Sequence, residues 1–276
     1  GLGDVYKRQT LDHLYNVLNA NPKIVGITTT TPTFGQAIRI AEKAREHCDA
    51  LLFGGPHASI FRGRLLKENP LIDAVVFGEA ENTIVDIVEK LEQGKNLSGV
   101  RGTIFRREGK IIENEAAPLI TDLDSITFPA RHLLDLRRYH AAFGILTSRG
   151  CQYNCVFCSR PSYLRGWRGR SPKNVVDEIE HLLTEYPDIA EKNNRSISFS
   201  DDCFNFDIDR AKAICDEIIK RRLDINLRCI TGLHVRNVDQ ELFVKMRRAG
   251  AREVWFGIES GNEQVLRRTG KGISLN

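Results

Sequence analysis

The sequence predicts an α/β fold built from two successive domains. In both halves, short apolar strands alternate with amphipathic helices, a pattern that favours parallel strands packed against helices. A hairpin pattern and an irregular stretch containing Pro129 interrupt the alternation near the middle of the chain. Four further strand–helix units follow this interruption, which suits the first part of a β/α barrel.

The first half predicts an open parallel sheet covered on both faces. Its strands are β-branched or apolar, and the second and third end at glycines. Its helices carry apolar residues at helical spacing, starting with Leu11 to Leu18. The next two runs, joined through Gly109, predict a hairpin. Strands are predicted at 24–29, 50–53 and 72–77, helices at 34–48, 61–69 and 83–93, and hairpin strands at 102–105 and 110–112.

The second half predicts four strands, each followed by a helix. Ser171 is the expected N-cap of the first helix, with Pro172 at its first position. Strands are predicted at 143–148, 197–199, 225–230 and 254–258, and helices from 172, at 209–222, at 239–249 and from near 263. The predicted organisation is a first domain at 10–117, a linker at 118–139 and a truncated barrel domain at 140–276.

Both ends of the chain predict a fragment of a longer protein. The stretch Asp4–Gln9 resembles the translation of a transposon-end adapter used in shotgun sequencing, so we expect residues 1–9 to be a cloning scar. The predicted barrel stops after its fourth strand. We therefore expect the fragment itself to be inactive.

Composition excludes several classes of function. Forty Lys and Arg against 36 Asp and Glu leave a net charge of +4, too weak to argue for nucleic-acid binding. No apolar run approaches the ~20 residues of a membrane-spanning helix. Seven cysteines, an odd number, in a chain without a visible secretory pattern favour a reducing compartment, and we expect a cytoplasmic protein.

The strongest chemical signal is a triplet of cysteines, Cys151, Cys155 and Cys158, directly after a predicted strand. Three thiolates within eight residues point to one soft metal centre: zinc, copper(I) or iron–sulfur. A structural zinc would need a fourth ligand nearby, and the next cysteine, Cys203, lies beyond a helix and a strand. A four-iron cluster held by three cysteines keeps one iron open for substrate or cofactor.

This C-x3-C-x2-C spacing, with aromatic Phe157 before the last cysteine, resembles the radical S-adenosylmethionine (SAM) superfamily. The resemblance implies that Cys151, Cys155 and Cys158 hold a [4Fe–4S] cluster, whose open iron binds SAM before one electron cleaves it. It further implies that Phe157 packs beside adenine. The residues implied to position SAM at strand ends are Asp201, Asp202, Glu259 and Ser260.

Some of these positions have simpler readings. The superfamily usually carries Gly-Gly-Glu where this chain has Ser200-Asp201-Asp202, and Asp202 could be an ordinary turn or cap residue. Arg228 and His234 flank another strand end, where an Arg could pair with the SAM carboxylate or simply be solvated. The arginines that follow the cysteines read best as a solvated basic loop.

In the first half, three predicted strands end in small residues, where open α/β sheets bind ligands. With the cysteine triplet downstream, these loops and the stretch Phe128–Arg131 resemble radical SAM proteins with a Rossmann-like cobalamin-binding domain. No D-x-H-x-x-G motif, whose His would ligate cobalt, is present. His57 reads more readily as a packed or exposed loop residue than as a ligand contact. The implied cobalamin-binding residues are Thr28, Thr29, Gly54, Gly55, His57, Gly78 and Glu79.

The resemblance implies a radical SAM enzyme that uses a [4Fe–4S] cluster, SAM and cobalamin for methyl transfer or a related radical reaction. The implied partners are a small-molecule substrate and an electron donor such as ferredoxin or flavodoxin. One alternative is a cobalamin-independent radical SAM enzyme of the methylthiotransferase type. A second is a non-enzymatic iron–sulfur module for electron transfer or sensing.

Overall fold

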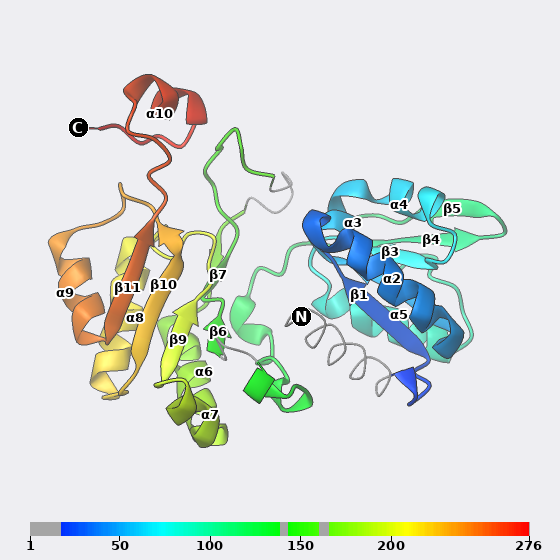
Figure 1. The fold of residues 1–276 in the computed structure, drawn as a ribbon, viewed down its shortest axis with the longest axis horizontal. Coiled ribbons are helices and arrows are strands. Elements are labelled where there is room, and N and C mark those ends of the chain that lie inside the picture. Colours follow the sequence, from blue (N-terminus) through cyan, green and yellow to red (C-terminus); the bar gives the residue numbers. More distant parts are fainter. Residues whose placement is uncertain (1–17, 139–142, 160–165, 276) are drawn as a thin grey trace, which may run out of the picture. The chain divides into compact units, whose positions relative to one another are not determined.

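The computed structural model describes residues 18–138, 143–159 and 166–275 (Figure 1). The chain forms two compact units, Gly1–Ile120 and Thr121–Asn276, so their boundary falls inside the stretch expected to be a linker. The expected scar and most of the first predicted helix lie outside the described residues. No helix in the described part is long and apolar enough to cross a membrane.

The first unit contains a five-stranded sheet in the order β1-β2-β3-β4-β5. The first three strands are parallel, as predicted, and each pairs with its neighbour in the chain. The last two form the predicted hairpin, which adds to the sheet in the antiparallel direction. The strands are β1 (Ile24–Thr28), β2 (Ala50–Gly54), β3 (Ala74–Val76), β4 (Thr103–Arg107) and β5 (Lys110–Glu113).

Helices cover both faces of this sheet, because alternate residues of its strands point in opposite directions. Leu51 and Phe53 belong to a buried cluster with α2 (Phe34–Ala44), α3 (Gly55–Phe61) and α4 (Gly63–Glu68). Leu52 belongs to a second cluster, which includes Ile87 of α5 (Glu81–Glu92). The expected two-sided covering is therefore confirmed.

Helix α3 is a feature that the sequence pattern did not predict. The pattern predicts that Gly54, Gly55 and Pro56 close the strand and that the next helix starts at Phe61. Instead the helix begins at Gly55, directly at the end of β2, with Gly54 as N-cap and Pro56 in the first turn. Proline is well tolerated there because its missing N–H would have no partner within the helix. A short α4 then fills most of the predicted 61–69 range.

The second unit contains a four-stranded, fully parallel sheet in the order β11-β10-β9-β6. This arrangement confirms the four predicted strand–helix units. The predicted first strand is shorter than expected, and its last residues form a separate two-stranded ladder, β7 with β8. The strands are β6 (Phe143–Ile145), β7 (Ser148–Arg149), β8 (Arg168–Gly169), β9 (Ser196–Phe199), β10 (Asn226–Leu233) and β11 (Ala251–Phe256).

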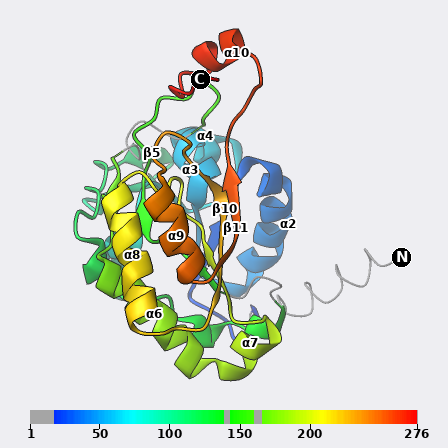
Figure 2. The ribbon, with the colours of Figure 1, turned by 90° about the vertical axis from the view of Figure 1, so that its left-hand side faces the viewer.

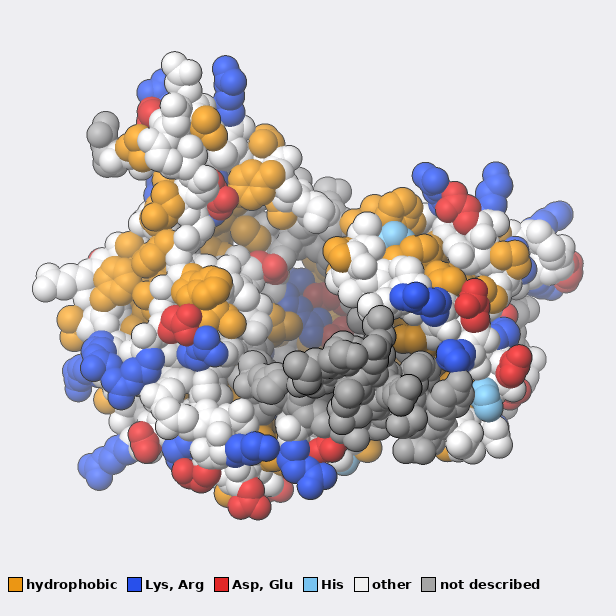
Figure 3. Space-filling model, viewed as in Figure 1, with side chains coloured by type: hydrophobic (Ala, Val, Ile, Leu, Met, Phe, Trp, Pro, Cys, Tyr) orange, Lys and Arg blue, Asp and Glu red, His pale blue; other side chains and the backbone are white. Residues whose placement is uncertain are grey.

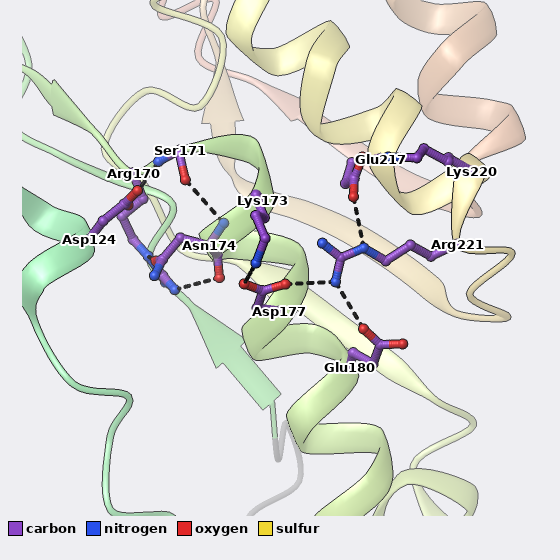
Figure 4. Close-up of polar contacts among 10 residues, drawn as sticks. All are labelled: Asp124, Arg170, Ser171, Lys173, Asn174, Asp177, Glu180, Glu217, Lys220 and Arg221. Carbon is purple, nitrogen blue, oxygen red and sulfur yellow. Dashed lines mark hydrogen bonds and ion pairs between the residues drawn. The ribbon is translucent and has the colours of Figure 1, made fainter.

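Three helices of this unit pack side by side on one face of the sheet: α6 (Pro172–Glu185), α8 (Ile208–Lys220) and α9 (Gln240–Arg248) (Figure 2). Ser171 caps α6 by accepting a hydrogen bond from the Asn174 N–H at 3.1 Å, as predicted (Figure 4). Further helices are α7 (Pro187–Lys192) and α10 (Glu263–Thr269).

The opposite face of the sheet carries exposed hydrophobic side chains in the described part of the chain (Figure 3). Trp255 of β11 is 55% exposed and Ile258, just after that strand, is 52% exposed. Large apolar groups at the mouth of a β/α sheet are typical of ligand sites. Because Ile258 lies just beyond the end of β11, this exposed apolar surface extends to the carboxyl end of the strand, where the predicted site residues lie.

The stretch predicted as a linker packs onto the second unit from Thr121 onward. It contains short 3-10 helices at Leu123–Ser125, Arg131–Leu133 and Leu136–Arg138. Leu123 and Arg131 are buried. This stretch therefore contributes to the interior of the second unit as well as connecting the two units.

Candidate functional site

The cysteine loop leaves the carboxyl end of β6 through Gly150. This glycine has φ of +90°, and a Cβ at this position would overlap the carbonyl oxygen of Gly166. Both facts require glycine at this position. Cys151 and Cys155 are partly buried and Cys158 is exposed, and all three are free thiols.

Two further elements hold the loop. The Val156 N–H donates to the carbonyl of Thr269, at the end of α10, over 2.9 Å. The ring of Tyr153 stacks on that of His234, with centroids 3.9 Å apart and planes at 5°. Asn237 Nδ2 donates to the Tyr153 hydroxyl at 3.0 Å. Three segments far apart in sequence therefore meet at the cysteine loop.

His234 is itself fixed by the completely buried Asn205. The Asn205 side chain accepts from the His234 N–H and donates to its carbonyl, both at 2.9 Å. His234 Nε2 lies 3.2 Å from the Lys271 carbonyl. Burial lowers the pKa of His234, which favours the neutral ring that stacks on Tyr153. His234, noted in the sequence only for its place beside a strand, thus supports the cysteine loop.

Lys271 and Glu259 form an ion pair beside the cysteine loop. Lys271 Nζ donates to Glu259 Oε1 and to the Gly257 carbonyl, each at 2.5 Å. Burial raises the pKa of the Cys155 thiol, the Lys271 ammonium lowers it, and the neighbouring thiols raise it again. The sequence analysis did not single out Lys271, although Gly270 and Gly272 on either side mark a tight local backbone.

The donor set fits a soft metal centre. Three thiols on one eight-residue loop are the ligands that iron–sulfur clusters use. Cys203 is a poor fourth ligand, because burial raises the pKa of its thiol to about 12 and its side chain is 3% exposed. Within residues 18–138, 143–159 and 166–275, no group of three His, Cys, Asp or Glu side chains is arranged closely enough to hold a metal ion in this conformation.

The adjacent acids Asp201 and Asp202 occupy different environments. Asp201 is fully buried, and its oxygens accept hydrogen bonds from the N–H groups of Thr147 and Ser148 and from the Thr147 hydroxyl. Burial raises the pKa of Asp201, and these donors oppose the rise. Asp202 is exposed at the strand end. Of the two acids expected to position SAM, Asp202 is thus the more accessible.

Of the remaining predicted SAM residues, Phe157 and Glu259 are exposed and Ser260 is partly buried. Phe157 is 56% exposed on the cysteine loop. Glu259 follows β11 with φ of +71° and pairs with Lys271. Ser260 accepts a hydrogen bond from the Asn262 N–H at 3.1 Å. The structure brings Glu259 to the cysteine loop through Lys271, whereas Ser260 serves the turn before α10.

In the first unit, the predicted cobalamin residues gather at one edge of the sheet because β1, β2 and β3 are parallel neighbours. Thr28 is paired with Gly54 in the ladder, and the Thr29 N–H donates to the Gly54 carbonyl at 3.1 Å. A Cβ at Gly55, whose φ is +85°, would lie 3.0 Å from the Thr29 backbone. Gly55 therefore allows two loops of the protein itself to pack closely.

The other predicted cobalamin residues also have partners within the protein. The Gly78 N–H donates to Ser59 Oγ at 3.3 Å, and Glu79 accepts from the Ile120 N–H at 2.9 Å. The His57 ring is 6% exposed and lies between Phe34 and Phe61, with centroid distances of 4.2 and 4.3 Å. In this conformation His57 is a packed residue, and the accessible part of the edge is formed by the strand ends around it.

Comparison with protein-family models assigns each unit. Residues 145–276 match the radical SAM superfamily, and residues 8–88 match the B12-binding domain. The chain belongs to the radical SAM proteins that carry a cobalamin-binding domain. A radical SAM domain implies a [4Fe–4S] cluster and SAM, and a B12-binding domain implies cobalamin.

Relatives of this radical SAM chain include methyltransferases and cyclases. It is 35% identical over 261 residues to an uncharacterised methyltransferase, PH0819, of Pyrococcus horikoshii, covering 92% of this chain and 55% of the relative. It is 32% identical over 277 residues to the anaerobic magnesium-protoporphyrin IX monomethyl ester cyclase of Rubrivivax gelatinosus, covering 94% and 48%. The chain thus spans about half the length of these curated relatives.

Solved structures of cobalamin-dependent radical SAM enzymes share the fold. OxsB with aqua-cobalamin and SAM bound superimposes with a TM-score of 0.78 at 23% identity, covering 95% of this chain and 39% of OxsB. TsrM of Kitasatospora setae with cobalamin and a [4Fe–4S] cluster bound also gives 0.78, at 22% identity, covering 98% and 57%. These similarities confirm the predicted order of domains, in which a cobalamin-type domain precedes a radical SAM domain.

Proposed function

We propose that the protein is a cobalamin-dependent radical SAM enzyme that catalyses methyl transfer or a related radical transformation of a small molecule. The observation that carries this proposal is the cysteine loop at the end of β6, in a chain whose other unit matches a B12-binding domain. When bound, the cluster supplies the electron that cleaves SAM, and cobalamin supplies the carrier for a methyl group.

The described residues would have separate tasks in that reaction. Cys151, Cys155 and Cys158 would hold the cluster, and loading would draw their side chains together. Asp202 and Phe157 would contact SAM, because both are exposed near the loop. Glu259 and Ser260, at the end of β11, would line another side of the same site. Asp201 would act from beneath the loop, since its oxygens already accept hydrogen bonds there.

In the first unit, the parallel strand ends would receive cobalamin. Small residues at Gly54 and Gly78 and the exposed Thr28 would leave this edge open for a large ligand, as is usual for open α/β sheets. Thr29 is buried and its hydroxyl donates to the Thr30 carbonyl, so it would support the edge from within the loop. Glu79 and His57 would help to shape this edge. An electron donor such as ferredoxin or flavodoxin would reduce the cluster, which fits a cytoplasmic location.

A cyclase-type reaction is a second candidate, because the Rubrivivax relative at 32% identity carries that activity in its name. Transfer of a labelled methyl group from SAM to the product indicates a methyltransferase, whereas ring formation without methyl transfer indicates a cyclase.

Anaerobic reconstitution of the full-length protein tests the proposal. Iron and sulfide uptake, cobalamin retention and SAM cleavage under reducing conditions are measured together. We expect all three. A protein that cleaves SAM without retaining cobalamin would support the cobalamin-independent alternative, and a protein that holds iron but leaves SAM intact would support an electron-transfer or sensing module.

A further inference from the structure

Strand β6 lies at an edge of its sheet, and its outer side is satisfied by side chains. In the order β11-β10-β9-β6, the described part of the sheet gives β6 one neighbour, β9. Edge strands carry backbone groups that still need hydrogen-bond partners. The Gly144 carbonyl accepts from Arg131 Nη2 at 2.9 Å, and the Leu146 carbonyl accepts from Arg170 Nη1 at 3.0 Å. Two arginines therefore take the place of a neighbouring strand.

Glu178 of α6 fixes both arginines from below. Its carboxylate is 2% exposed, and its two oxygens lie 2.8 Å from Arg131 Nη1 and 2.5 Å from Arg170 Nη1. Arg170 also donates through Nε to Asn174 at 2.6 Å, at the start of the same helix (Figure 4). A buried carboxylate needs such partners, and removing its charge would leave two desolvated guanidinium groups without a counter-charge.

Asp201 and Arg210 hold the exit of the same strand from two sides. Asp201 Oδ1 accepts from the N–H of Thr147 at 2.5 Å and of Ser148 at 3.1 Å. The Thr147 carbonyl accepts from the Arg170 N–H at 2.9 Å and from Arg210 Nη2. Arg210 Nε donates to the Arg170 carbonyl at 2.7 Å. Both backbone groups of Thr147 are thus fixed four residues before Cys151.

The absence of a side chain at Gly169 leaves room for the Arg210 guanidinium group. A Cβ at Gly169, the ladder partner of Ser148, would lie 2.5 Å from Arg210 Nε. The Arg210 guanidinium also lies 5.6 Å from the centroid of the Trp167 ring. Arg131, which ends the Phe-Pro-Ala-Arg stretch noted in the sequence, reaches this network from the segment before the barrel.

We propose that these side chains form a positioning network that sets where the cysteine loop leaves β6, and so sets the geometry of the cluster ligands. We call it the β6 edge network; its members are Arg131, Arg170, Glu178, Asp201 and Arg210. The inference rests on the proposed function, because it takes the cysteines as cluster ligands. Groups that orient metal ligands in this way typically change metal affinity by about 10–100-fold when removed.

The first test uses hydrogen exchange in the full-length apoprotein, which needs no cluster. Asp201→Ala should speed exchange at 143–150 far more than in α8 or α9, because three donors to Asp201 lose their acceptor. Asp201→Asn should restore protection, since its oxygen still accepts from both N–H groups and its NH2 can donate to the Thr147 hydroxyl. Exchange that rises equally throughout the second unit, or does not rise at 143–150, would overturn the proposal.

The second test compares two acids of one helix. Glu178→Gln should speed cluster loss to a chelator by about tenfold or more and alter the electron paramagnetic resonance spectrum of the reduced cluster. Glu180→Gln is the matched control, because Glu180 is 53% exposed and pairs with Arg221 on the outer surface; its spectrum and loss rate should equal those of the wild type. Equal behaviour of the two variants would contradict the network.

The third readout separates positioning from direct contact with SAM. In Asp201→Ala, the fraction that retains a cluster should keep a KM for SAM near that of the wild type, while cluster content falls. A raised KM in both Asp201→Ala and Asp201→Asn at full cluster content would show that Asp201 contacts SAM and would overturn the proposal. If the wild type takes up no cluster, the proposed function fails, but the exchange experiment on the apoprotein still decides whether the network fixes the loop.

Discussion

Tyr153 stacks on His234 at a centroid distance of 3.9 Å with nearly parallel rings, and this contact joins the cysteine loop to the end of β10. Tyr153, the middle one of the three residues between Cys151 and Cys155, is therefore a structural anchor. His234 is fixed in turn by Asn205 and by the Lys271 carbonyl. The position of the loop thus depends on contacts with strands β6 and β10 and with the end of α10.

Replacing Tyr153 by Ala should loosen the loop. Such an aromatic contact contributes about 0.5–1.5 kcal/mol, so we expect faster cluster loss and local loss of protection at 151–158, with little change in global stability. Tyr153→Phe keeps the stack and removes only the hydrogen bond from Asn237, so it should lie close to the wild type. Equal cluster loss in Ala and Phe variants would show that the hydroxyl, not the stack, holds the loop. Cluster absorbance against time in the presence of a chelator measures the rate of cluster loss in both variants.

Adding a methyl group at Gly55 should destabilise the first unit. The positive φ alone costs a non-glycine residue about 1–3 kcal/mol, and the new Cβ would press on the Thr29 backbone at 3.0 Å. Gly54→Ala is the matched control, because residue 54 is extended and its Cβ would lie 3.8 Å from the nearest atom, the Val76 carbonyl oxygen. Thermal unfolding should show a clear loss for Gly55→Ala and little for Gly54→Ala.

The same pair of variants examines the cobalamin edge. If the ligand approaches the end of β2, Gly54→Ala should weaken cobalamin binding in equilibrium dialysis while leaving the fold intact. Cobalamin affinity equal to that of the wild type would contradict the placement of Gly54 in the binding edge.

Arg221 links helices α6 and α8 through three carboxylates (Figure 4). Its side chain lies 2.8 Å from Asp177 and Glu217 and 2.9 Å from Glu180. Burial raises the pKa of Asp177, but hydrogen bonds from Lys173 and Arg221 outweigh that rise and leave the pKa below its usual value. Hydrogen bonds from Arg221 and Lys220 lower the pKa of Glu217 in the same way. Carboxyl groups with lowered pKa values stabilise the folded state when ionised.

Arg221→Met should therefore lower the unfolding midpoint at neutral pH, by a modest amount because the partners are partly exposed. The difference from the wild type should be full above the ordinary Asp and Glu pKa values of about 3.9 and 4.3. It should vanish as the pH falls through the lowered values in the folded protein. A difference that is unchanged at acid pH would mean that Arg221 acts through packing of its aliphatic part instead.

Much of the fold could be predicted from the sequence because its signals are local. Short apolar and β-branched runs predicted β1 to β3, and Ser171 followed by Pro172 predicted the start of α6. Helix α3 was missed because Gly-Gly-Pro is also a turn signal. The β7–β8 ladder was missed because each of its strands has two residues, too few to show a period.

Some residues of the candidate site could be predicted and others could not, because only some of their contacts are local in sequence. The three cysteines are close in sequence, so their spacing alone identified the loop. The buried environment of Asp201 depends on Thr147 and Ser148, more than fifty residues earlier, and no local pattern distinguishes it from the adjacent, exposed Asp202. The role of Lys271 likewise depends on contacts with Glu259 and Gly257 that appear only in the folded chain.

The central claim is that the loop of Cys151, Cys155 and Cys158 holds the cluster that cleaves SAM. The most direct measurement is iron content together with reductive SAM cleavage in anaerobically reconstituted Cys155→Ala, beside Cys48→Ala as a control outside the second unit. Two thiolates hold a four-iron cluster poorly, so Cys155→Ala should lose both iron and SAM cleavage, while Cys48→Ala keeps both. Retention of iron and SAM cleavage by Cys155→Ala would contradict the claim.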